Sequence, residues 1–162
     1  YSTMDLEPLA EDLVTQLTKQ KQSLTTVESC TGGLVFATMT NIAGASAVME
    51  RGFITYSNDA KKQLVGVQDA TLKAYGAVSE EVAKEMATGG CQRSSDGAIS
   101  VALTGIAGPG GGSDAKPVGL VYIAVADSTR CIVSRHVFDG DRSAIRTAAV
   151  KVSLIHVKEF IY

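Results

Sequence analysis

The sequence has few of the residues that most often hold metals. It contains only two histidines and three cysteines in 162 residues. Cys30, Cys91 and Cys131 lie far apart and form no Cys-x-x-Cys pair, and His136 and His156 belong to no ligand-spaced cluster. These spacings argue against a structural zinc site, and nothing supports a metal held by carboxylates. A sparse, odd set of cysteines is typical of reduced thiols, so we expect a cytoplasmic protein. We also expect neither a metal nor another cofactor.

Long apolar runs and an excess of charge are also absent. The longest apolar stretches are far shorter than the ~20 residues that span a bilayer, and no signal peptide is visible. Lys and Arg number 15 against 17 Asp and Glu, which gives a net charge of -2. No basic run indicates a nucleic-acid surface. We therefore expect neither membrane nor nucleic-acid binding, and the composition, 45% hydrophobic and 20% charged, is that of an ordinary globular domain.

Helical and extended patterns alternate along the chain. Apolar spacing predicts helices at about 6–19, 32–41, 58–65, 79–91 and 141–155. Nearly apolar or β-branched runs predict strands at about 24–28, 53–57, 98–103, 118–126 and 131–138, the last two joined as a hairpin. This order predicts one α/β domain over residues 1–162, with a three-layer α/β/α architecture and a mixed, mostly parallel sheet. In the last helix, Ile145, Ala149, Val152 and Ile155 are expected to form the buried face.

Three segments follow the first three predicted strands and hold the residues that could carry chemistry. They are the turn after residue 28, the stretch 56–61 and the glycine-rich stretch 104–112. In open α/β sheets, ligands bind beyond the carboxyl ends of the strands. We therefore expect these three segments to converge on one site.

Ser29 is the candidate nucleophile in the first segment, and it needs a base because a free hydroxyl is barely ionised at neutral pH. Neither histidine is well placed, so Lys61 is the better candidate, provided that burial or a nearby cation lowers its pKa. Three alternatives stay open. Ser29 is alternatively interpreted as a helix N-cap. Lys61 is more simply interpreted as a solvated surface lysine, and Cys30 as inert packing rather than the nucleophile.

The glycine-rich loop Gly105–Gly112 and two arginines could hold an anion. The loop is neither a Walker A motif, since no Gly-Lys-Ser/Thr closes it, nor a clean dinucleotide fingerprint. Glycines nevertheless let backbone amides approach a phosphate or carboxylate closely, so the loop is interpreted as an anion-binding loop. The alternative interpretation is that the loop is only a flexible connection. Arg142 and Arg146 share one face of the last helix and could grip a phosphate, although an ordinary solvated helix start is the simpler interpretation. The residues alone therefore predict a site for a small anionic ligand. One function compatible with such a site is a serine hydrolase that lacks the usual histidine.

A series of ordered motifs then resembles a known family. They are Glu28-Ser29-Cys30-Thr31-Gly32-Gly33, Gly52-Phe53-Ile54-Thr55-Tyr56-Ser57-Asn58, Gly76-Ala77-Val78-Ser79, Thr104-Gly105-Ile106-Ala107-Gly108-Pro109, Lys116-Pro117-Val118-Gly119 and Phe138-Asp139-Gly140-Asp141-Arg142. Together they resemble the CinA C-terminal domain family, the nicotinamide-nucleotide amidases, from about residue 5 to the end. Many members carry an additional N-terminal domain, which this sequence is expected to lack.

The resemblance implies deamidation of nicotinamide mononucleotide to nicotinate mononucleotide and ammonia, in pyridine nucleotide salvage. It also implies a fold like that of anticodon-binding domains and a homo-oligomer, dimer or trimer. By the same resemblance, Ser29 is the nucleophile, Lys61 and Tyr56 activate it, and Arg142 contacts the ligand, with Arg146 a weaker candidate. The implied nucleotide-contacting residues are Thr31, Gly32, Gly33, Thr104, Gly105, Gly108, Gly110 and Gly111. The alternative is a nucleotide-binding module linked to competence or damage responses, regulatory and without turnover.

Overall fold

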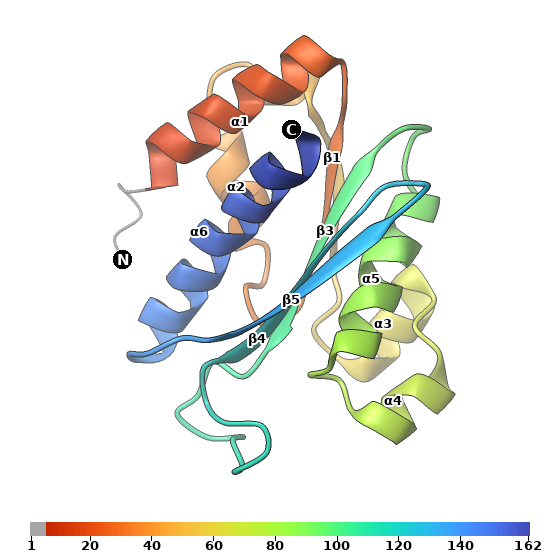
Figure 1. Cartoon of the computed structure of the whole chain (residues 1–162), viewed down its shortest axis with the longest axis vertical. Coiled ribbons are helices and arrows are strands. Elements are labelled where there is room, and N and C mark those ends of the chain that lie inside the picture. Colours follow the sequence, from red (N-terminus) through yellow and green to blue (C-terminus); the bar gives the residue numbers. More distant parts are fainter. Residues whose placement is uncertain (1–5) are drawn as a thin grey trace.

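The computed structural model describes residues 6–162, in which helices and strands alternate (Figure 1). The helices are α1 (Glu7–Gln20), α2 (Leu34–Thr40), the 3-10 turn η2 (Ala45–Ala47), α3 (Asn58–Val65), α4 (Asp69–Tyr75), α5 (Glu80–Gln92) and α6 (Arg142–Ile161). The strands are β1 (Leu24–Glu28), β2 (Met49–Ile54), β3 (Ile99–Gly105), β4 (Leu120–Ala126) and β5 (Cys131–Val137). Among these, no helix is long and apolar enough to cross a membrane.

The five strands form one sheet in the order β2-β1-β3-β4-β5. β1 runs parallel to both β2 and β3, whereas β4 runs antiparallel to β3 and β5. Four strands therefore point one way and β4 the other, which confirms the predicted mixed sheet and its hairpin. Helices α1, α2 and α6 lie on one face, and α3, α4 and α5 lie on the other (Figure 1). The three-layer α/β/α prediction is confirmed.

The sheet separates two apolar cores. One core packs α1, α2 and α6 on the sheet through side chains such as Leu13, Leu17 and Leu154. The other packs α5 on it through side chains such as Val82 and Met86. Both central strands, β1 and β3, are buried along almost their whole length, as expected for strands covered on two faces.

Two glycines, Gly89 and Gly90, lie inside α5 near its end and let the helix pack closely on its neighbours. A Cβ on Gly89 would lie 1.8 Å from the Val65 carbonyl oxygen of α3. One on Gly90 would lie 2.5 Å from Val27 Cγ2 of β1. Close approach of the backbones therefore outweighs the low helical propensity of glycine here.

Some predicted boundaries are wrong for physical reasons. The second strand is Met49–Ile54 rather than 53–57, because β2 is an edge strand whose mostly exposed side chains give no apolar alternation. The helix α4 was missed because it is short and buries only Leu72. The helix α3 begins at Asn58 as predicted, and its N-cap is Ser57, whose side chain accepts from the Ala60 N–H.

The buried face of α6 also differs from the predicted one. Ile145 and Ala149 are buried as expected, but Val152 and Ile155 are only half-buried. The residues that complete the face are Thr147, Ala148, Val150, Ser153, Leu154, Val157 and Phe160. The helix packs against α1, α2 and the strands β3 and β4, so these elements bury a wide part of its surface. A single apolar stripe therefore does not describe its buried face.

Candidate active site

A pocket of about 340 Å³ lies at the carboxyl ends of β1, β2 and β3, where the three segments converge as predicted. The predicted site residues that line it are Ser29, Tyr56, Lys61, Thr104, Gly105, Gly108, Gly110, Gly111 and Arg142. The pocket is also lined by Asn58, Ile106 and Ala107, which lie in the predicted segments but had no individual role, and by Cys30, which was interpreted as packing. Sequence reasoning did not assign Ala77 and Val78 to the site. The Gly76-Ala77-Val78-Ser79 motif was a signal for both.

Lys61 contacts Ser29 at the floor of this pocket. The lysine amine Nζ lies 3.1 Å from Ser29 Oγ, 2.8 Å from the Thr55 carbonyl oxygen and 3.3 Å from the Tyr56 carbonyl oxygen. The side chain is only 1% exposed. Lys61 reaches this position because α3 begins at Asn58, a few residues after β2 ends, and carries Lys61 in its first turn. The interpretation of Lys61 as a solvated surface lysine is wrong.

Burial also changes the acidity of this lysine. Desolvation lowers the pKa of Lys61 from 10.5 to about 8, against a small opposing effect of the Cys30 sulfur. Among residues 6–162, no acidic side chain lines the pocket to stabilise the ammonium form. With a pKa of about 8, roughly one Lys61 in ten is neutral at pH 7. The amine can thus serve as a base at neutral pH.

Cys30 stands next to Ser29 but is a poor nucleophile. Its side chain is 7% exposed, and burial raises the pKa of its thiol to about 11. A thiol with that pKa is almost entirely protonated at neutral pH, and the thiolate is the reactive form. The packing interpretation of Cys30 fits this environment.

The turn that carries Ser29 is held from inside by Glu28. The N-cap of α2 is Gly33, which offers no side-chain cap, so the N-cap interpretation of Ser29 is wrong. The fully buried Glu28 carboxylate instead accepts from the Val35 and Phe36 N–H groups at 2.8 and 3.1 Å. It also accepts from the Thr31 hydroxyl at 2.7 Å. Sequence reasoning missed this role, although a carboxylate at the end of an otherwise apolar strand was a signal.

Three predicted substrate-binding residues lie beside the pocket rather than along its lining. Thr31 is buried and its hydroxyl is used on Glu28. Gly32 and Gly33 have φ values of 59° and 105°, a left-handed conformation in which glycine avoids strain. Their observed contribution is the sharp bend from β1 into α2. Contact of these three residues with a nucleotide stays a prediction.

Arg142 joins two sides of the pocket mouth. Its guanidinium donates to the Gly108 carbonyl oxygen at 2.7 Å and to the Tyr56 hydroxyl at 3.3 Å. Tyr56 therefore meets Lys61 through its carbonyl and Arg142 through its hydroxyl, and its side chain is largely exposed. Thr104 is fixed by donation from its hydroxyl to the Ala77 carbonyl at 2.8 Å.

Arg146 and the histidines lie outside the pocket lining. Arg146 donates to the carbonyl oxygens of Cys30 and Thr31, both at 3.0 Å, so the structure gives the two arginines different partners rather than one shared anion site. The Nε2 atoms of His136 and His156 are 3.1 Å apart between β5 and α6, so neither serves Ser29, as expected.

Comparison with known proteins agrees with these motifs. Residues 6–161 match the CinA C-terminal domain. The chain is 46% identical over 151 residues to the nicotinamide-nucleotide amidohydrolase PncC of Escherichia coli, a match that covers 93% of this chain and 91% of that protein. It is 44% identical over 165 residues to a CinA-like protein of Chloroherpeton thalassium. The chain spans 39% of the length of that relative and 36% of another curated relative.

Solved structures share the fold as well as the sequence. The competence/damage inducible protein CihA of Agrobacterium tumefaciens superposes with a TM-score of 0.92 at 44% identity, over 96% of this chain and 94% of that one. A CinA superfamily protein of Enterobacter cloacae gives a TM-score of 0.90 at 31% identity, over 97% and 92%. With a match over nearly all its residues, this chain belongs to the CinA C-terminal domain family.

Proposed function

We propose that this protein is an amidohydrolase that converts nicotinamide mononucleotide to nicotinate mononucleotide and ammonia. The observation that carries the proposal is the buried Lys61 amine, 3.1 Å from Ser29 Oγ in a pocket with no acidic lining residue among those described. Similarity to a nicotinamide-nucleotide amidohydrolase over 91% of that protein supports the substrate. The family resemblance supports a cytoplasmic location and a homo-oligomer as parts of the same proposal.

The arrangement of acceptors around Lys61 supports its role as the base. A neutral amine has two N–H groups and one lone pair. The carbonyl oxygens of Thr55 and Tyr56 can only accept, so they take the two N–H groups, and the lone pair is left for the Ser29 hydroxyl. A proton that moves from Ser29 to this amine is stabilised at once by the same three oxygens.

Amide hydrolysis then proceeds in two steps. Ser29 Oγ attacks the carboxamide carbon while Lys61 takes the hydroxyl proton. Lys61 returns that proton to the departing amide nitrogen, the C–N bond breaks, and ammonia leaves an acyl-serine. Water then attacks the ester with Lys61 again as base, which releases the carboxylate and restores Ser29.

The lining of the pocket supports an anionic, partly flat substrate. Its charged side chains among the described residues are Lys61 and Arg142, both cationic, which favours a phosphorylated ligand. The Gly105–Gly111 stretch offers backbone N–H groups at the mouth, where a phosphate would lie. Ala77, Val78 and Ile106 provide apolar walls for a pyridine ring.

Ammonia release from nicotinamide mononucleotide tests the proposal. Wild-type protein is expected to release one ammonia per nicotinate mononucleotide formed. Ser29→Ala is expected to abolish release, whereas Ser128→Ala, in the exposed β4–β5 turn, leaves it unchanged. Release that survives Ser29→Ala, or that chelators destroy, contradicts the serine mechanism.

The regulatory alternative rests on two grounds, a solvated Lys61 and the competence-linked naming of the family. The burial of Lys61 removes the first ground, and the second remains. The regulatory alternative predicts calorimetric binding of the mononucleotide without product over hours. An acyl-enzyme mass on Ser29, trapped by acid quench during turnover, excludes it.

A further inference from the structure

We propose that Arg146 is a positioning residue that orients the Ser29 turn so that backbone N–H groups face the reacting carbonyl oxygen. The proposal rests on the proposed amide hydrolysis. Arg146 donates from Nε to the Cys30 carbonyl and from a terminal nitrogen to the Thr31 carbonyl, both at 3.0 Å. It does not line the pocket, so this effect passes through the turn and not through contact with the substrate.

Peptide geometry fixes the directions in which the Thr31 and Cys30 N–H groups point. In a trans peptide, the N–H points away from the C=O of the same plane. The Cys30–Thr31 peptide is trans, so fixing the Cys30 carbonyl on Arg146 directs the Thr31 N–H to the opposite side. The Ser29 carbonyl is held in the same way by the Gly32 N–H at 3.1 Å, which directs the Cys30 N–H away from Gly32.

These two N–H groups are available, whereas their neighbours are not. The Ser29 N–H donates to the Leu103 carbonyl, and the Gly32 N–H is used within the turn. Within residues 6–162, no other residue accepts from the N–H groups of Cys30 and Thr31, and the Cys30 N–H faces only its own sulfur, a weak acceptor. Backbone donors directly after a nucleophile that lack a strong acceptor are what a developing oxyanion requires.

The turn is thus fixed from two sides by opposite charges. Glu28 holds the Thr31 hydroxyl and the start of α2 from the interior. Arg146 holds the two carbonyls from α6, one helical turn after Arg142, which reaches the pocket mouth. A guanidinium fork can donate to both carbonyls at once, whereas a lysine ammonium is a point charge that does not match two fixed directions.

Kinetics on variants separate positioning from a merely structural role. In Arg146→Gln we expect kcat with nicotinamide mononucleotide to fall by about 30-fold or more with KM changed less than about threefold, because donors that act mainly in the transition state are misaligned. Arg146→Lys is expected to recover only part of kcat. Rates are normalised to the folded fraction measured by circular dichroism.

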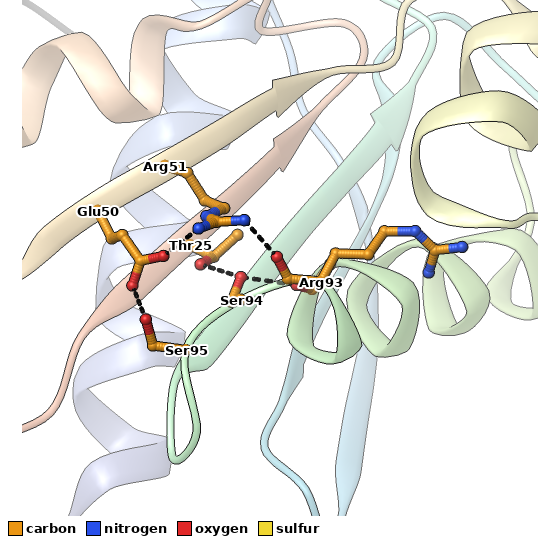
Figure 2. Close-up of polar contacts among 7 residues, drawn as sticks. Thr25, Glu50, Arg51, Arg93, Ser94 and Ser95 are labelled. Carbon is orange, nitrogen blue, oxygen red and sulfur yellow. Dashed lines mark hydrogen bonds and ion pairs between the residues drawn. The ribbon is translucent and has the colours of Figure 1, made fainter.

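Arg51→Gln is the matched control. Arg51 also donates to a backbone carbonyl, that of Arg93 at 2.7 Å, and so ties β2 to the end of α5 (Figure 2). Its polar partners are Arg93 and Glu50, and neither belongs to the Ser29 turn. This variant is expected to lose stability and keep kcat. If Arg146→Gln keeps kcat, or if Arg51→Gln loses it equally per folded molecule, the positioning role is wrong.

Titration with 3-pyridinylboronic acid separates failure of this inference from failure of the proposed function. The boronate forms a tetrahedral adduct with a serine and needs the oxyanion donors, whatever the natural substrate is. We expect tenfold or more weaker binding to Arg146→Gln than to wild type, and unchanged binding to Arg51→Gln. A wild type that binds the boronate but does not hydrolyse the mononucleotide contradicts the proposed function alone. Equal boronate affinity in wild type and Arg146→Gln, or none in wild type, overturns the positioning role.

Discussion

The buried Lys61 makes the stability of this protein depend on pH in a direction that can be calculated. Its pKa is about 8 in the folded protein against 10.5 for an ordinary lysine. Between these two values the unfolded chain binds more protons than the folded one. Stability therefore rises with pH across this range, because linkage makes the unfolding free energy increase wherever the unfolded state binds more protons.

Lys61→Met isolates this contribution, because methionine has a similar length and no charge. The unfolding free energy of wild type minus that of the variant is expected to grow by about 2 kcal/mol from pH 7 to pH 9.5, from the two pKa values and 1.36 kcal/mol per unit. The Thr55 and Tyr56 carbonyls lose their donor at every pH, so that loss cancels in the change. Below pH 7 the difference is expected to stay nearly constant, since both states are then protonated.

Urea unfolding of both proteins at half-unit pH steps measures this difference. The midpoint and slope at each pH give the unfolding free energy, and every other titrating group is common to the two chains. A difference that stays flat from pH 7 to pH 9.5, or that shrinks, would refute the reasoning. It would mean that the fold does not resist protonation of Lys61, and the base at the proposed site would then lack its physical basis.

Other consequences can be tested separately. If Lys61 is the base, kcat/KM for nicotinamide mononucleotide rises about tenfold per pH unit below pH 8 and levels above it, whereas a profile flat from pH 6 to pH 8 excludes the role. Glu28→Gln places an amide against the α2 N–H groups and is expected to cost about 1–3 kcal/mol in urea unfolding, with kcat lowered; unchanged stability contradicts its holding role. Arg142→Met is expected to raise KM more than it lowers kcat in steady-state assays, and an unchanged KM argues against phosphate contact. Gly90→Ala is expected to destabilise by about 1–3 kcal/mol in the same unfolding assay, because the new methyl meets Val27 and Ser100; a wild-type midpoint would show that α5 can move away.

The fold could be predicted from sequence where burial is two-sided. β1 and β3 are apolar along their length because helices cover both faces, so their position and type were clear. At the edge, β2 buries only its first residue fully, and no periodicity marks it. The position of an edge strand depends on its backbone hydrogen bonds to one neighbouring strand. A single sequence contains no side-chain pattern that reveals this pairing.

The site was predictable in its parts but not in its electrostatics. The convergence of the Ser29 turn, the 56–61 stretch and the glycine loop follows from strand order alone. Whether Lys61 is buried does not, because a lysine one turn into a short helix has the same local sequence when it faces water. Burial here depends on how β2 and α3 meet, since Thr55 and Tyr56 supply the acceptors that keep the amine inside.

The same limit explains why sequence reasoning missed Glu28 and misjudged Arg146. Each was judged by its local pattern, one as the last residue of a strand and the other as a helix-surface arginine. Each instead acts on the backbone of the Ser29 turn, Glu28 through α2 N–H groups a few residues ahead and Arg146 through carbonyls more than a hundred residues away. Backbone groups are identical in every residue, so no side-chain pattern identifies such partners. The candidate nucleophile Ser29 can be found by its motif, but the charged side chains that hold its turn have to be found in the fold.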